Sequence, residues 1–133
     1  SIVHTSGIPA AAAKITENTD YMLVSYTGGW GYGSAASKKY DLSSYDKIFM
    51  TYVATATATN DYNWAKLFVT EDITASPVAK IASATLLTSK QTQASNTIVL
   101  DVSNLEGEYY IGFEISANTN ITISIKLTDL HLE

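Results

Sequence analysis

The sequence contains no cysteine and no arginine, and these absences narrow the functions open to it. Without thiols the chain has no disulfide framework, no zinc–thiolate centre and no cysteine nucleophile. All eight basic residues are lysines, and thirteen acidic residues outweigh them to give a net charge of −5. Nucleic acids and anionic membrane surfaces are bound through clustered positive charge, so we expect neither nucleic acid nor membrane as a partner.

Long apolar runs and helical periodicity are also lacking. No stretch approaches the roughly 20 apolar residues that span a bilayer as a helix. Only the alanine-rich segment Ala10–Lys14, which follows Pro9, hints at a helix, and so few residues cannot sustain one alone. A short strand leading into a turn at 17–20 accounts for the same residues equally well. No repeat or linker divides the chain, so residues 1–133 are expected to form one domain.

What the sequence does contain is alternation of apolar and polar residues with a period of two. Ile121, Ile123, Ile125 and Leu127 alternate with polar residues, and a shift after Leu127 predicts a bulge near Asp129. The same alternation predicts strands at 20–26, 37–42, 46–57, 63–71, 78–86, 97–102, 108–116 and 121–131, with a further strand near 11–15.

Short strands with turn signals between them indicate an all-β fold, an antiparallel two-sheet β-sandwich. Every strand with one apolar face must have that face covered, so the apolar positions should meet in one core. We expect the following residues to be buried together: Ile48, Met50, Ile98, Leu100, Ile111, Phe113, Ile123 and Ile125.

Two segments of the sequence resemble those of a known family. The segments Tyr40–Ile48 and Leu100–Phe113 resemble turns and strands of galactose-binding-like jelly-roll modules, and the resemblance covers residues 20–130. Such modules are carbohydrate-binding modules of secreted glycosidases, or accessory domains of phage tail and baseplate proteins. The resemblance implies a jelly roll within a larger multidomain protein, located outside the cell or on the virion surface. These segments mark scaffold turns, so no binding residue is carried over from them.

The resemblance also implies that a structural calcium ion could be bound, since similar modules often carry one. Glu71, Asp72 or Asp20 could supply oxygen ligands, but no ligand spacing singles them out. The metal site is therefore left open, and no other cofactor is expected.

The segment Thr27–Ser34 places Trp30 and Tyr32 among four glycines. Glycine favours a loop here, and a large ring on a loop can stack on a ligand. The alternative is that Trp30 folds back and caps the end of a sheet.

Alternating strand direction brings every second loop to the same pole of a sandwich. The loops at 27–36, 58–62, 87–96 and 117–120 should therefore share one pole. They combine rings with amide, carboxylate and ammonium groups, namely Trp30, Tyr32, Asn60, Asp61, Tyr62, Lys90, Gln91, Gln93, Asn118 and Asn120. Sugars need this mixture, because their C–H faces pack on rings and their hydroxyls pair with planar polar groups. The alternative is that Asn and Asp serve only as turn residues.

Trp64 is a further candidate, at the start of the segment Trp64–Val69. Alternation puts Trp64, Lys66 and Phe68 on the face opposite Ala65 and Leu67. If the Trp64 face is solvated, Trp64 and Lys66 form a platform for an extended glycan. If it is the core face, Trp64 is a buried anchor and the Lys66 ammonium reaches the edge.

Nothing in the sequence indicates an enzyme. Glycoside hydrolysis needs two carboxylates across a cleft, and no acid pair stands out. His4 and His131 lie near the termini with no expected Ser or Asp partner, and hydrolase and phosphate-loop motifs are missing. We predict a non-catalytic carbohydrate-binding module whose ligand is an oligosaccharide or polysaccharide. The alternative is a structural or protein-interaction domain of a phage tail or bacterial surface protein, without a sugar site.

Overall fold

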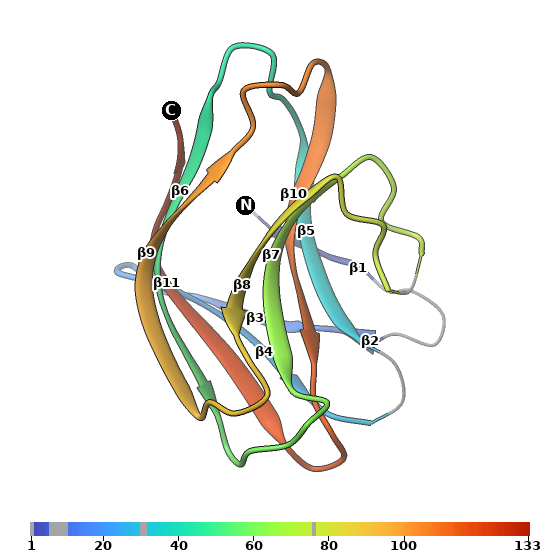
Figure 1. The fold of residues 1–133 in the computed structure, drawn as a ribbon, viewed down its shortest axis with the longest axis vertical. Coiled ribbons are helices and arrows are strands. Elements are labelled where there is room, and N and C mark those ends of the chain that lie inside the picture. The colour runs from blue at the N-terminus through green and yellow to red at the C-terminus, as the bar shows by residue number, and fades with distance from the viewer. Residues whose placement is uncertain (1, 6–10, 30–31, 76) are drawn as a thin grey trace.

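Alternating residues form strands along almost the whole chain in the computed structural model, which describes residues 2–5, 11–29, 32–75 and 77–133 (Figure 1). The strands of these residues are β1 (Ile2–Thr5), β2 (Ala11–Ala12), β3 (Lys14–Glu17), β4 (Met22–Thr27), β5 (Gly33–Asp41), β6 (Lys47–Ala56), β7 (Trp64–Thr70), β8 (Ala82–Leu87), β9 (Gln93–Asp101), β10 (Glu108–Ser116) and β11 (Thr122–Leu132). None of the described residues is helical, and the described part of the chain accordingly has no helix able to cross a membrane.

The strands form two sheets that pack face to face. Sheet I has the order β1-β5-β10-β7-β8, with β2 beside β5, and sheet II has the order β3-β4-β11-β6-β9. Neighbouring strands are antiparallel, except that β2 runs parallel to β5. From β4 to β11 the order is that of two Greek keys in a jelly roll. The predicted antiparallel two-sheet β-sandwich is confirmed.

The core lies between the sheets and is built by the predicted alternation. In β6, Ile48, Met50 and Tyr52 point inward while the residues between them face outward. Seven of the eight predicted core residues are buried in one cluster, and Ile98, on the edge strand β9, is partly buried against it. The predicted bulge is confirmed by a register shift between Leu127 and Asp129.

The structure decides between the two alternatives left open for the N-terminal residues. The alanine-rich segment contributes β2 and leads into β3, so the hint of a helix is wrong and the strand alternative is right. The Asn18 amide donates to the carbonyl of Tyr21, which closes the turn before β4. These short strands lie at sheet edges, where alternation is weak because few neighbours cover them.

A second apolar layer covers part of the outer face of sheet I. Phe68 and Ala36 are fully buried there against Val78, with Ile73 and Tyr110 partly buried beside them. Val78 and Ile73 come from the loop at 71–81 that joins β7 to β8. This loop therefore crosses the outside of the sheet, and we call it the strap.

Four loops meet at one end of the sandwich, at the bottom of Figure 1, and we call this end the loop pole. Gly28 bridges to Thr119, and the Gly28 amide donates to Ile121 O at 2.8 Å. Asn63 Oδ1 accepts from the amide of Asn118, and Ala56 N donates to Thr92 O. The predicted meeting of the loops is confirmed. Two of them are shorter than predicted, because β5 already begins at residue 33 and β9 at residue 93.

Gly28 offers a test of this packing. A Cβ at Gly28 would stand 1.9 Å from the carbonyl oxygen of Asn118, whereas a Cβ at Gly29 would meet nothing within 4 Å. Gly28→Ala should therefore destabilise the protein by about 1–3 kcal/mol, the cost of overpacking. Gly29→Ala should stay within about 0.5 kcal/mol of the parent. Urea denaturation measures both, and equal stabilities would contradict the close approach of these loops.

Candidate functional site

Tyr32 and Trp64 form a pair of aromatic rings on the outer face of sheet I. Trp64 opens β7, where alternation sends Ala65 and Leu67 into the core and leaves Trp64 on the other side. The Tyr32 ring, just before β5, has its centroid 5.5 Å from that of Trp64 at an interplanar angle of 34°. Both rings are partly buried, and Trp64 belongs to neither apolar cluster. Trp64 is therefore not a core anchor but faces outward.

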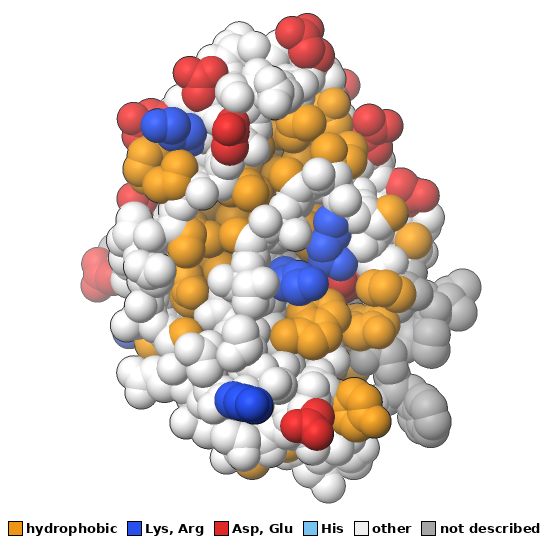
Figure 2. Space-filling model, in the orientation of Figure 1, with side chains coloured by type: hydrophobic (Ala, Val, Ile, Leu, Met, Phe, Trp, Pro, Cys, Tyr) orange, Lys and Arg blue, Asp and Glu red, His pale blue; other side chains and the backbone are white. Residues whose placement is uncertain are grey.

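Two ammonium groups lie over the Trp64 ring. Nζ of Lys66, from β7, is 5.0 Å from the ring centroid, and Nζ of Lys80, from the strap, is 5.6 Å from it. A cation over an aromatic face contributes about 0.5–2 kcal/mol, depending on its desolvation. Figure 2 shows lysine side chains against hydrophobic ones on the face that it presents. We call Tyr32, Trp64, Lys66 and Lys80 the ring–lysine cluster.

Glu114 holds the strap and Lys80 in place. Its carboxylate is 1% exposed, although it lies on the outward side of β10. Oε1 accepts from Lys80 Nζ at 2.5 Å, and Oε2 accepts from the Val78 amide at 2.8 Å. Lys80 Nζ also donates to the Val78 carbonyl at 2.9 Å. A buried carboxylate is tolerated only when it is paired and hydrogen-bonded, so these contacts fix the strap on the sheet.

Sequence reasoning missed Glu114. In β10 it alternates with inward-facing Phe113 and Ile115, and alternation alone places such a residue in solvent. The sequence feature that could have indicated a buried Glu114 lies on the neighbouring strand β7, where the apolar residue Phe68 is on the same outward side. Gly112 stands opposite Phe68, and a Cβ there would be 2.6 Å from Phe68 Cζ. A large ring packed over a glycine indicates a second layer above the sheet.

The loop pole carries a polar pocket of about 470 Å³. It is lined by side chains of the β6–β7 and β8–β9 loops, namely Thr59, Asn60, Asp61, Tyr62, Ser89 and Lys90. Tyr62 is 70% exposed, so its ring is available to a ligand. The Tyr62 carbonyl accepts from Ser116 Oγ at 2.5 Å, and Ser116 pairs with Trp64 across the strands. The pocket therefore adjoins the ring–lysine cluster.

The predicted amides have structural partners. Oδ1 of Asn60 accepts from the Tyr62 amide, Oε1 of Gln91 accepts from Thr88, and Oδ1 of Asn118 accepts from Thr119. These are turn contacts, as the turn-residue alternative states, and they leave the amide NH₂ groups as donors. The turns bring the predicted residues to one end of the sandwich.

The remaining predicted residues lie in separate places. Trp30 lies outside the described residues. Gln91 lines a groove between the edges of β8 and β9 rather than the pocket. Gln93 opens β9 and is exposed, and Asn120 takes a positive φ of 67° in the β10–β11 turn.

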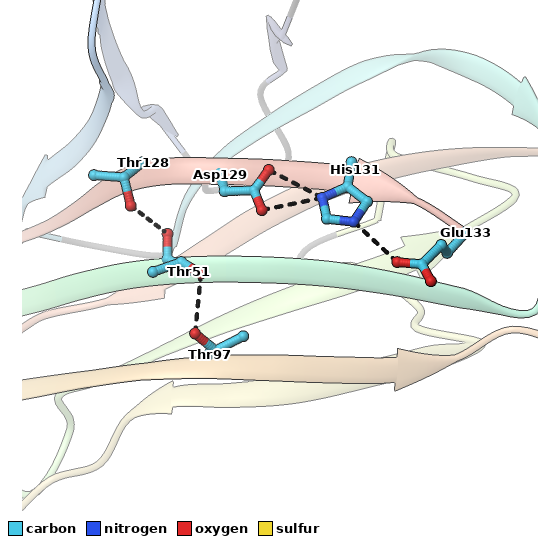
Figure 3. A network of polar contacts seen from close by, with 6 residues as sticks. All are labelled: Thr51, Thr97, Thr128, Asp129, His131 and Glu133. Carbon is cyan, nitrogen blue, oxygen red and sulfur yellow. Dashed lines mark hydrogen bonds and ion pairs between the residues drawn. The ribbon is translucent and has the colours of Figure 1, made fainter.

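His131 has acidic partners, contrary to the sequence expectation (Figure 3). Its Nδ1 lies 3.0 Å from both carboxylate oxygens of Asp129, and its Nε2 lies 3.1 Å from Glu133 Oε2. The Phe49 ring stacks on the imidazole at 5.2 Å. Hydrogen bonds to the carboxylate of Asp129, and then to that of Glu133, raise the pKa of His131 above its ordinary value of 6.5. Carboxylates occupy both ring nitrogens, so His131 is not placed to activate a hydroxyl nucleophile.

No metal site is evident within the described ranges, where no three His, Cys, Asp or Glu side chains gather to hold an ion. Asp72, a calcium candidate, instead accepts from the hydroxyl and amide of Thr74 at 2.6 and 2.8 Å. These hydrogen bonds lower the pKa of Asp72, with the hydroxyl contributing most. Asp72 therefore serves a turn.

Comparisons with known proteins bear on the fold. No protein-family model and no curated protein matches the chain. A carbohydrate-binding module of family 28, specific for non-crystalline cellulose, matches with a TM-score of 0.57 at 6% identity, covering 99% of this chain and 87% of that chain. The N-terminal cellulose-binding domain of Cellulomonas fimi β-1,4-glucanase C matches with a TM-score of 0.52 at 16% identity, covering 99% and 88%.

A third structure, the enzymatically active domain of bacteriophage CBA120 tailspike protein 4, matches with a TM-score of 0.50 at 12% identity, covering 100% of this chain and 19% of that chain. At such identities the likeness concerns the fold. The jelly-roll resemblance seen in the sequence is matched by these carbohydrate-binding modules.

The buried ion pair can be tested by removing one or both charges. Lys80→Met should destabilise the protein by about 3 kcal/mol, because Glu114 would stay buried with one donor fewer. In Lys80→Met/Glu114→Gln the neutral amide can still accept from Val78, so part of this loss should be recovered. Urea denaturation measures both variants. A double variant less stable than Lys80→Met would show that an uncompensated charge is not the cause.

The His131 contacts predict a pH effect. Because its pKa is raised on folding, the stability that His131 contributes is present below its ordinary pKa and is lost as pH rises through the raised pKa. Asp129→Asn should lower the pKa more than Glu133→Gln does. An NMR titration of the imidazole protons measures this, and an unchanged pKa in both variants would contradict the assignment.

Proposed function

We propose that this chain is a non-catalytic carbohydrate-binding module whose site lies where the ring–lysine cluster meets the loop pole. The observation that carries the proposal is the outward pair of Tyr32 and Trp64 rings beside a polar pocket with the exposed ring of Tyr62. An aromatic wall with a few convergent polar groups is the general form of a small-ligand site. The fold is shared with modules that are named for binding carbohydrate.

Each part of the site has a role in this proposal. The C–H face of a sugar ring packs on Tyr32, Trp64 or Tyr62, while hydroxyls on its edge accept from NH₂ groups and donate to carboxylate. The polar contacts come from Asn60, Asp61 and Asn118, whereas Gln91 lines a separate groove and is left out of the site. Trp30 joins the stacking residues on the strength of its place in the sequence. Stacking supplies area and the polar groups supply orientation.

Binding without hydrolysis is the natural outcome of these side chains. A glycosidase needs one carboxylate as acid and a second as base or nucleophile, facing each other across the bond to be cleaved. Glu114 is buried with both oxygens engaged, and Asp61 is an exposed loop residue. Neither is placed as half of such a pair.

A module of this kind would serve a larger extracellular enzyme or a virion surface protein. The similar tailspike chain is much longer, since this chain covers 19% of it. Single sites for sugars bind weakly, with Kd in the micromolar to millimolar range, roughly −8 to −4 kcal/mol. Several copies in one assembly would raise retention through avidity. The alternative, a structural or protein-interaction domain of a phage tail, is favoured only by the likeness to the tailspike.

Alanine substitutions at the rings test the proposal, after a glycan array has identified a ligand. Trp64→Ala and Tyr62→Ala should each weaken glycan binding by about 1–3 kcal/mol, the range of aromatic contact residues. Tyr62→Ala should leave stability within about 0.5 kcal/mol, because the ring is 70% exposed. Tyr45→Ala, at the opposite pole, is the control and should bind normally. Calorimetric titration and thermal melting measure the two quantities.

Trp30→Ala distinguishes the two interpretations of that residue. A loss of binding alone would indicate ligand contact, whereas an equal loss of melting temperature would indicate a cap. If oligosaccharides up to millimolar concentration shift no NMR signal of Tyr32, Tyr62 or Trp64, sugar binding at this site is wrong and the structural alternative stands.

A further inference from the structure

The ring–lysine cluster is a positive spot on an acidic protein. The net charge of the chain is −5, yet two of its eight lysines direct their ammonium groups to one ring, that of Trp64. Like charges repel, so bringing two of them to one ring has a cost that other interactions must offset. For Lys80 that interaction is its ion pair with Glu114 at 2.5 Å.

Lys66 has no such partner. It stands directly opposite Glu114 in the register of β7 and β10, where an ion pair between the two would be expected. Glu114 instead bonds to Lys80 and to the Val78 amide. Within the described residues Lys66 makes no ion pair and no hydrogen bond to a side chain, and its ammonium lies over Trp64. Lys66, Lys80 and Glu114 together therefore carry one positive charge in excess.

Lys80 is held in position by hydrogen bonds, whereas the N–H donors of Lys66 are available to a ligand. The Lys80 ammonium donates to Glu114 and to the Val78 carbonyl, which leaves one of its three N–H groups. Lys66 is a partly buried residue of a strand, so its side chain has less freedom to lose when it meets a ligand. A ligand anion at the ring would find one anchored cation and one with its N–H groups open.

We propose that the glycan bound at the ring–lysine cluster is anionic, and that Lys66, with Lys80 behind it, binds its acid group while Trp64 and Tyr32 stack on the sugar ring. This inference rests on the proposed carbohydrate-binding function and names its ligand class. A uronic acid and a sulfated sugar share the required chemistry, a ring face next to a negative group. A hydrogen bond from an ammonium to an anionic oxygen joins two opposite charges, so it gains a Coulomb attraction that a neutral hydroxyl on the same lysine does not supply.

The experiment compares matched ligands on the intact chain. Each neutral oligosaccharide of a panel is titrated beside its uronate counterpart and its sulfated counterpart, at low and at high NaCl concentration. We expect the anionic members to bind roughly three- to tenfold more tightly than the neutral one at low salt, with the advantage shrinking as salt screens the charges. Which anionic member binds better identifies the acid group.

Two lysine variants locate the effect. Lys66→Gln should remove most of the preference for the anionic ligand while binding of the neutral one changes little. Lys126→Gln is the matched control, because Lys126 also lies over a ring, 4.5 Å from the centroid of Tyr21, but on sheet II. Both variants change the net charge equally, so only Lys66→Gln should alter the preference.

Three outcomes would overturn the inference. Neutral members that bind as tightly as the anionic ones, with binding lost in Trp64→Ala, would leave the carbohydrate-binding function standing and refute the anionic ligand. Equal losses for both ligand classes in Lys66→Gln would show that Lys66 only positions the Trp64 ring. Absence of binding by every member of the panel would overturn the proposed function and this inference with it.

Discussion

The buried carboxylate of Glu114 sets the layout of the face that carries the candidate site. A charge that is 1% exposed needs donors, and the two donors that the described residues give Glu114 both come from the strap. The hydrogen bonds to the Glu114 carboxylate hold Val78 against Phe68 and hold the Lys80 ammonium over the Trp64 ring. One electrostatic requirement thus covers part of the outer face of sheet I with an apolar layer, and leaves the part beside the loop pole to the aromatic rings.

The alternation that predicts the fold works where one face of a strand is buried and the other is wet. It located β4 and β6 to β11 within a few residues, with the exception of the starts of β8 and β9. Residues 78–81 belong to the strap instead of β8, and the first residues of β9 are exposed on an edge. It failed for the first half of β5, because residues 33–37 are small and all buried, between the core and the outer layer. A strand buried on both faces shows no period of two, so this stretch read as a continuation of the glycine loop.

The candidate site was only partly predictable for a related reason. The number of strands and their alternating direction can be predicted from local sequence patterns. These two features correctly placed Asn60, Asp61 and Tyr62 at one pole. They also showed that Trp64 and Lys66 share a face. What the sequence could not supply was the strap, because its place on sheet I depends on the pairing of Glu114 with Lys80, which are 34 residues apart. Contacts between side chains so far apart in the chain produce no periodic pattern in the sequence.

Turn residues and aromatic residues of the candidate site differ in how much the fold depends on them. Three amide side chains accept hydrogen bonds within turns through their carbonyl oxygens, namely those of Asn60, Gln91 and Asn118. Replacing any of them would therefore alter its loop as well as any ligand contact. Structures with this fold share as little as 6% identity with the chain, because many apolar residues can satisfy the same alternating core. Tyr32, Trp64 and Lys66 have no such part in the turns or in the core, whereas Lys80 pairs with the buried Glu114. Under the proposed function, changes at those three residues can therefore alter ligand binding with little effect on the sandwich, provided that Lys80 and Glu114 still hold the strap.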